Sequence, residues 1–294
     1  MPAYDFDFQR YVERRKGERA AERREGSAYA YSGDQRLRGL LSRLRPVTLA
    51  LEASARLWKA TARAELLGTS VRITERSYPR VHKAAELCAA RLHVALPPLH
   101  ASPLRGMSAH TFGTDDEPVV LLHADLCDGL SEAELCHVLG AELGRIQNGA
   151  TLLGTAHHYL HRAPGGFLRW IVGPARAALD GWWRRAAVTA DRAGLLCSRD
   201  LAASASAIRR VARAASDEAI AEPPARAGAP SGTDGEPGSG GGAPPTAADL
   251  VGARIAALEI FSRSSYYLGV RGEPGGASPE ETDRQVAELL KGIP

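Results

Sequence analysis

One stretch at positions 222–245, EPPARAGAPSGTDGEPGSGGGAPP, most constrains how this 294-residue chain can fold. It consists almost entirely of glycine, proline, small and charged residues, so it has almost no apolar surface to bury. Because folding must offset the loss of chain entropy by burying apolar surface, we expect a disordered linker here. The remaining chain is long enough for one full-sized core, since 44% of all residues are hydrophobic. The sequence therefore predicts one domain that a linker interrupts.

The sequence falls into four predicted regions, and this linker is one of them. The N-terminal arm mixes arginine and glutamate at helical spacing with few apolar residues, which is typical of a solvated helix. Beyond the linker, apolar residues recur at helical spacing, so we expect the last helices to pack back on the main domain. The predicted boundaries are 1–33 for the charged arm, 34–221 for the main domain, 222–247 for the linker and 248–294 for the C-terminal helices.

Helical patterns dominate the predicted main domain. Asp34 is a candidate N-cap for a first helix, and Pro46 interrupts the helical pattern that follows. Ser131 and Glu134 stand at the spacing of a capping box, in which each side chain accepts a hydrogen bond from the other residue's backbone N–H. The sequence therefore predicts a long helix that begins after Ser131 and ends near Gly149.

Short runs in the middle of the chain have the character of strands. Three of them, at 93–99, 107–112 and 118–123, are apolar or alternating and are separated by turn residues. A shorter run of this kind stands at 70–74. Helices before and around a small antiparallel sheet make an α+β fold class, mainly helical.

Charge and composition exclude several classes of partner. The 37 lysines and arginines against 34 aspartates and glutamates leave a net charge of +3, which gives no strong field toward nucleic acid. No window approaches the roughly 18 apolar residues that a membrane-spanning helix needs, and the first residues lack the apolar core of a signal peptide. The four cysteines stand singly, as reduced thiols do. We therefore expect a cytoplasmic protein without nucleic-acid partner or transmembrane segment.

The most informative stretch runs from Met107 to Gly149 and reads MSAHTFGTDDEPVVLLHADLCDGLSEAELCHVLGAELGRIQNG. Together with 182–196 and 254–267, it resembles the HtpX and CAAX-prenyl endopeptidase family of zinc metallopeptidases. The resemblance implies a gluzincin-like domain. It also implies that Ser108 and Ala109 belong to an edge strand that receives an extended substrate.

The resemblance implies where a zinc site would lie, and the chain lacks the ligands there. Active members carry His-Glu-x-x-His on one helix and a glutamate on a later helix. The corresponding residues here are Ala141, Arg145 and Ala187, and only the general-base position, Glu142, is kept. Without a cation that lowers the pKa of water toward about 7, Glu142 alone loses nearly all hydrolytic power. We therefore predict a pseudo-metallopeptidase with no metal and no other cofactor.

Other residues of the family motif are kept around the lost ligands. Asp191, Arg192 and Asn148 match it, and Asp191 resembles an aspartate that stands beside the metal-binding histidines. Removing zinc would leave Glu142 and Asp191 with no cation between them, which is costly in a partly buried cleft. We expect the Arg145 guanidinium to fill that place, and the alternative, in which Arg145 points to solvent, stays open.

Three functions are compatible with these residues. In the first, the cleft binds a peptide or partner protein by strand addition along 107–112. In the second, the chain is an active zinc metalloendopeptidase with non-standard ligands, such as His137 with Glu142 and a later histidine; His157 and His161 stand one helical turn apart. In the third, the chain is a structural scaffold. The partner and the oligomeric state are left open.

Overall fold

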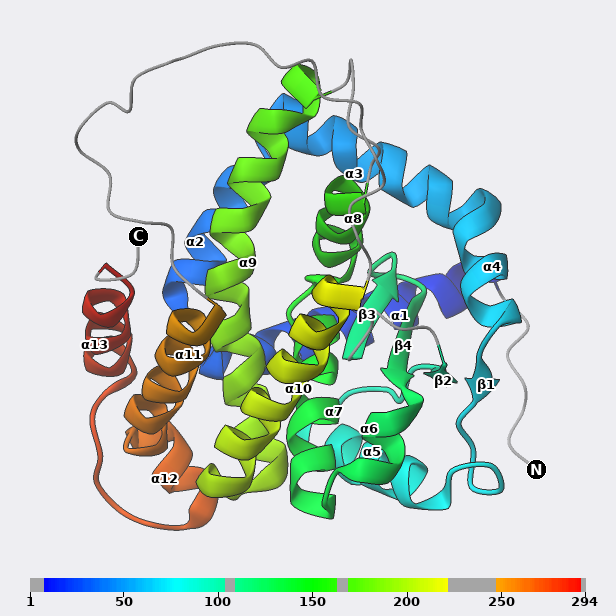
Figure 1. Cartoon of the computed structure of the whole chain (residues 1–294). Helices are drawn as coiled ribbons and strands as arrows, with labels where there is room; N and C mark the ends of the chain where they lie inside the picture. Colours follow the sequence, from blue (N-terminus) through cyan, green and yellow to red (C-terminus); the bar gives the residue numbers. More distant parts are fainter. Residues whose placement is uncertain (1–7, 104–108, 163–168, 222–246, 292–294) are drawn as a thin grey trace.

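The structure, a computed structural model of the chain, describes residues 8–103, 109–162, 169–221 and 247–291. Most of these residues are helical, and a small sheet lies at one side (Figure 1). The helices are α1 (Phe8–Tyr29), α2 (Ser32–Leu41), α3 (Arg45–Leu57), α4 (Arg63–Gly68), α5 (Pro79–Leu92), α6 (Ala124–Gly129), α7 (Glu132–Gln147), α8 (Thr151–Arg162), α9 (Arg169–Ser198), α10 (Leu201–Ala221), α11 (Ala247–Ser262), α12 (Ser265–Arg271) and α13 (Pro279–Lys291). A π-helical segment, Trp58–Ala62, joins α3 to α4. The strands are β1 (Val71–Arg72), β2 (Leu99–Ser102), β3 (Ala109–Gly113) and β4 (Pro118–His123).

The sheet is mixed, with the strand order β1-β2-β4-β3. β2 and β4 run parallel, whereas β1 and β3 run antiparallel to their neighbours. The expectation of an antiparallel sheet is therefore wrong, because β4 inserts between β2 and β3. Residues 119–122 of β4 are all buried, and a continuously apolar strand is most stable at the centre of a sheet with both faces covered. The α+β, mainly helical class holds.

Sequence expectations agree best with the structure where local chemistry decides. Ser131 and Glu134 form both hydrogen bonds of a capping box, and α7 begins there as predicted. β4 spans the predicted 118–123. The predicted strand at 93–99 is wrong, because His93 adopts a left-handed conformation (φ 51°, ψ 46°) that ends α5, and β2 begins only at the far end of this run.

Asp34 is not the N-cap of α2, since the helix begins two residues earlier with Tyr31 at the N-cap position. Its carboxylate is buried and accepts hydrogen bonds from Trp182 Nε1 at 2.8 Å and from Thr189 Oγ1 at 2.7 Å. Both partners lie on α9. A buried carboxylate needs such partners, and they come from a helix that no local pattern links to Asp34.

Helices α7 and α9 pack directly against each other in the core of the fold. Gly140 and Gly144 of α7 face Cys197 and Ala193 of α9, and a methyl group on either glycine would overlap these neighbours. Gly194 of α9 is packed in the same way against α7. Glycine at the contact lets the two backbones approach, and the candidate site lies along this contact.

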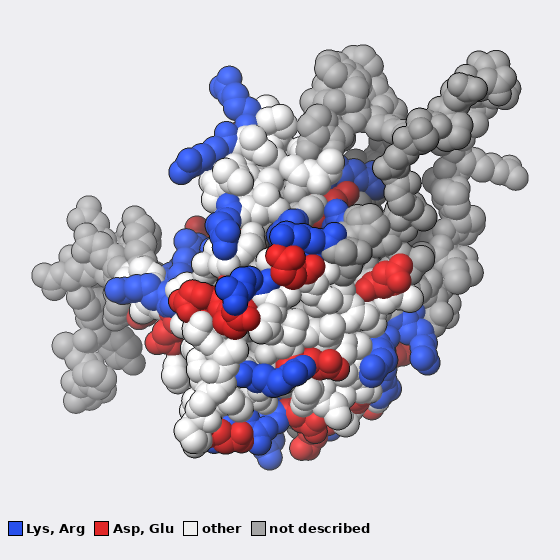
Figure 2. Space-filling model, turned by 90° about the vertical axis from the view of Figure 1, so that its left-hand side faces the viewer, with Lys and Arg blue, Asp and Glu red and all other residues white. Residues whose placement is uncertain are grey.

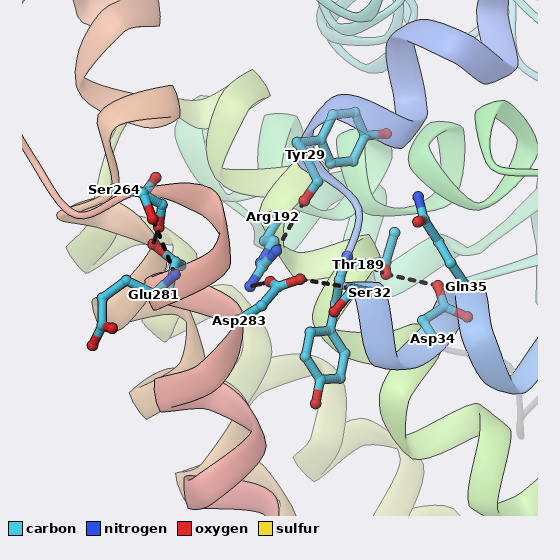
Figure 3. Close-up of polar contacts among 12 residues, drawn as sticks. Tyr29, Ser32, Asp34, Gln35, Thr189, Arg192, Ser264, Glu281 and Asp283 are labelled. Atoms are coloured by element: carbon cyan, nitrogen blue, oxygen red, sulfur yellow. Dashed lines mark hydrogen bonds and ion pairs between the residues drawn. The ribbon is translucent and has the colours of Figure 1, made fainter.

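The C-terminal helices pack on this central pair. α11 lies against α9 and α10, and α13 lies against α2 and α11 (Figure 1). Figure 3 shows the polar contacts that hold them: Arg192 of α9 donates to the carbonyl of Tyr29 at 3.1 Å and to the carboxylate of Asp283 at 2.8 Å. Asp283 also accepts from the backbone N–H of Ser32 at 2.8 Å. One buried guanidinium therefore ties α1, α9 and α13 together. The predicted linker lies almost wholly outside the described residues.

Acidic and basic side chains are interspersed on the face shown in Figure 2, so this face presents no large field of one sign. None of the helices in the described ranges combines the length and the apolar character that crossing a membrane requires.

Candidate functional site between β3, α7 and α9

Strand β3 lies against the part of α7 that carries Glu142, the residue to which the resemblance assigns the general-base position. Thr111 of β3 donates from Oγ1 to Oε2 of Glu142 at 2.7 Å, and both residues are buried. Successive side chains of a strand point to opposite faces, so Phe112 points away from α7. There it stacks on Trp58, with the ring centroids 5.9 Å apart and the planes at 9°. The sheet alternation thus places a hydroxyl on the Glu142 carboxylate.

Arg145 pairs with Glu142 within α7. Its Nε lies 3.3 Å from Oε1 of Glu142, and the two side chains are only 11% and 7% exposed. The guanidinium also stacks over the indole of Trp183 on α9, 4.2 Å from the ring centroid. Arg145 therefore points into the site and not into solvent. Its Nη1 atom is buried and has no hydrogen-bond partner within the described part of the chain.

Asp191 receives its cation from a different helix. Arg254 of α11 binds both carboxylate oxygens, with Nε–Oδ2 at 2.8 Å and Nη2–Oδ1 at 2.7 Å, and His137 Nε2 lies 3.6 Å from Oδ1. Burial alone would raise the pKa of Asp191, but Arg254 and then His137 outweigh it and lower the pKa to about 2. Two arginines, and not Arg145 alone, therefore neutralise the two buried carboxylates of the site.

The residues at the three positions where the resemblance expects zinc ligands do not fit a zinc ion. Ala141 and Ala187 are buried and carry no ligand atom. Arg145 is a permanent cation without a lone pair to offer, and it occupies the carboxylate of Glu142. Zinc chemistry therefore has no donor set at this place.

The alternative ligand set with His137 is not brought together either. The His137 ring is buried between α7 and α9, with Nδ1 against Gly194 and Nε2 toward Asp191. Within the described residues, groups of three or more metal-binding side chains occur at two places, His157 with His161 and Asp180, and Glu75 with His82 and Glu86. Neither group contains His137 or Glu142.

The other predicted site residues hold the framework around the site. Asn148 ends α7 and donates from its amide to the hydroxyl of Tyr29 at 3.1 Å, which fixes the end of α1. Arg192 is joined to Tyr29 and to Asp283 of α13, in the contacts of Figure 3. Ala109 begins β3, whereas Ser108 lies outside the described residues.

Three residues of this site escape sequence reasoning: Thr111, Trp183 and Arg254. Arg254 stands at the start of the stretch 254–267 that carries the family resemblance, which is the one signal for it. No spacing pairs it with Asp191 from across the linker. Thr111 lies in the predicted edge strand, but only the register with β4 fixes the face on which its hydroxyl lies.

Comparison with known proteins gives one distant relationship. Over 141 residues the chain is 28% identical to the plastoglobule-localized metallopeptidase 48, chloroplastic, of Arabidopsis thaliana. The match covers 46% of this chain. It spans 41% of the length of the Arabidopsis protein. No protein-family model matches the chain, and no solved structure does. The similarity supports a metallopeptidase relationship.

The pH dependence of stability tests the pairing of Asp191. Because the folded-state pKa of about 2 lies below the ordinary 3.8, the paired carboxylate stabilises the fold above pH 4, and this contribution is lost as the pH falls toward 2. Between pH 6 and pH 2.5, we expect the wild type to lose about 1.5 kcal/mol more unfolding free energy than Asp191→Asn, measured by urea denaturation. Asp125→Asn, at a carboxylate that is 90% exposed, serves as the control and should follow the wild type. Parallel curves for wild type and Asp191→Asn would contradict the pairing.

Proposed function

We propose that this chain is a pseudo-metallopeptidase: a peptidase-like domain of gluzincin-like arrangement that binds an extended segment of a peptide or protein and does not hydrolyse it. The pairing of Arg145 with Glu142 carries this proposal. A carboxylate that holds a guanidinium is not free to act as a general base, and a fixed positive charge at a ligand position repels a second cation. The distant metallopeptidase relationship supports the peptidase-like part.

The outer edge of β3 offers the proposed binding surface. β3 lies at the edge of the sheet, and in its antiparallel pairing with β4, Gly113 stands opposite Pro118, which has no N–H to give. Alternate residues of such a strand direct their N–H and C=O groups to the same side, so those of Ala109, Thr111 and Gly113 point outward. At Gly113 both groups already bond to Thr155 Oγ1, at 3.0 and 3.1 Å. A bound segment therefore begins its pairing at Ala109, the half-buried start of the strand, and stops before Gly113.

The unpartnered donor of Arg145 supports the same occupant. A buried N–H group without an acceptor is costly, and a carbonyl oxygen or carboxylate from a bound segment would satisfy it. Arg145 contacts Glu142, which in turn accepts from Thr111 of the edge strand. The donor therefore lies one side chain away from the strand that we propose as the docking edge.

A cytoplasmic location is part of this proposal. The four cysteines are buried and unpaired, and burial raises the pKa of the Cys127 thiol to about 11, so this thiol is protonated and inert at neutral pH. Buried reduced thiols are typical of a reducing compartment. The name of the Arabidopsis relative places that protein in the chloroplast.

Hydrolysis is tested directly with casein and a mixture of unlabelled peptides, analysed by mass spectrometry after incubation with added zinc or with a chelator. We expect no cleavage in either condition, because no donor set for zinc stands beside Glu142. Contaminating peptidase is recognised by cleavage that persists in Glu142→Gln. Cleavage by the wild type that the chelator and Glu142→Gln both abolish would show an active metalloendopeptidase and overturn the proposal.

Strand addition is tested at Ala109. Proline at this first residue of β3 removes an outward N–H without breaking a hydrogen bond to β4, whereas Ala109→Val keeps that N–H. For peptides selected by display on the wild-type chain, we expect Ala109→Pro to weaken binding about tenfold, the equivalent of roughly one hydrogen bond, measured by fluorescence polarisation. Ala109→Val should bind within about twofold of the wild type. Equal binding by all three proteins would favour a scaffold over strand addition.

A further inference from the structure

A separate cluster of metal-binding side chains lies where α8 meets α9. His157 and His161 stand one turn apart on α8, with ring centroids 4.4 Å apart. Their Nε2 atoms lie 2.9 Å and 2.5 Å from the same oxygen, Oδ1 of Asp180 on α9. The sequence supplies the histidine pair by its spacing, and the fold supplies the third ligand. We propose that His157, His161 and Asp180 bind a divalent transition-metal ion of the zinc type.

The chemistry of the cluster fits this ion. The ligand atoms all lie within 4.8 Å of one another, so small side-chain rotations place them around one ion at zinc–ligand distances of about 2.0–2.2 Å. Two imidazoles with one carboxylate favour zinc and its neighbours over magnesium or calcium, which prefer oxygen ligands. The side chains of His161 and Asp180 are 34% and 38% exposed, so the ion has access from solvent. Three protein ligands leave a fourth position for water or another ligand.

The second group of potential ligands, Glu75, His82 and Glu86, is a weaker candidate. It has one imidazole, and both of its carboxylates are exposed. Exposed acidic groups of this kind stay hydrated without an ion. This group therefore serves as the internal comparison for the α8–α9 cluster.

Arg176 determines which tautomer His161 adopts. Its Nη2 lies 3.0 Å from His161 Nδ1, and a guanidinium can only donate, so Nδ1 accepts and the proton sits on Nε2, the atom that faces Asp180. Metal binding at Nε2 requires that proton to move to Nδ1, from which Arg176 must then withdraw. Arg176 is exposed and free to do so. An acceptor in place of Arg176 would hold the metal-binding tautomer.

The ion would join α8 to α9 and so stabilise the contact between Trp183 and Arg145. The ring of His157 stacks on Trp183, with centroids 4.9 Å apart and planes at 12°. Trp183 also carries the guanidinium of Arg145. Fixing His157 to α9 through a metal therefore fixes the indole on which Arg145 rests.

The experiment uses the full chain, stripped with a chelator and titrated with zinc chloride by isothermal calorimetry. We expect one zinc per chain and a rise in melting temperature on adding zinc. His161→Ala and Asp180→Ala should each weaken binding by at least about tenfold, whereas His82→Ala should leave it unchanged. Arg176→Gln, whose amide oxygen can accept from Nδ1–H, should tighten it. Circular dichroism confirms that each variant is folded.

Three results would overturn the site. The first is a wild-type chain that gives neither zinc-dependent heat nor a shift in melting temperature. The second is zinc binding that survives in both His161→Ala and Asp180→Ala. The third is zinc binding that His82→Ala removes. Cobalt gives an independent reading, because a tetrahedral site with nitrogen and oxygen ligands produces visible absorption that His161→Ala must abolish.

Discussion

Two carboxylates are buried between α7 and α9, and the rest of the chain must supply positive charge to compensate them. Glu142 and Asp191 are each less than 10% exposed, and a buried carboxylate without a cation costs several kcal/mol. The fold supplies that charge from within: Arg145 comes from the same turn of α7, and Arg254 comes from α11, far along the sequence. Arg145 stands at a position where the resemblance expects a zinc ligand, and Arg254 binds the neighbouring carboxylate of Asp191. The guanidinium that balances the charge of Glu142 therefore also offers no lone pair to a metal ion.

The need to compensate buried charges also explains why the C-terminal helices belong to the core. α11 delivers Arg254 to Asp191, and α13 delivers Asp283 to the buried guanidinium of Arg192. Each contact compensates a charge that α9 alone cannot balance. The close approach of α7 and α9, which Gly144 and its neighbours allow, brings these charges within reach of one another. The C-terminal segment 247–291 is thus required by the electrostatics of the centre.

The sequence predicts the features that residues close together in the chain determine. The capping box at Ser131 and the limits of β4 can be read from neighbouring residues. Asp34 shows where this ends: its short-range pattern is that of an N-cap, yet its partners lie on α9. The place of β4 in the sheet, the pairing of Asp191 with α11, and the third member of the histidine cluster all depend on contacts between distant segments. No spacing in the sequence encodes them.

The central claim is that Arg145 balances the charge of Glu142 in the place of a metal, and a double-mutant cycle tests it most directly. Urea denaturation of the wild type, Arg145→Met, Glu142→Gln and the double variant gives the four free energies of unfolding. We predict that Arg145→Met alone costs about 3 kcal/mol, because it strands a buried carboxylate, and that adding Glu142→Gln restores much of that loss. The coupling should exceed about 1 kcal/mol. Simple additivity of the two substitutions would contradict the account.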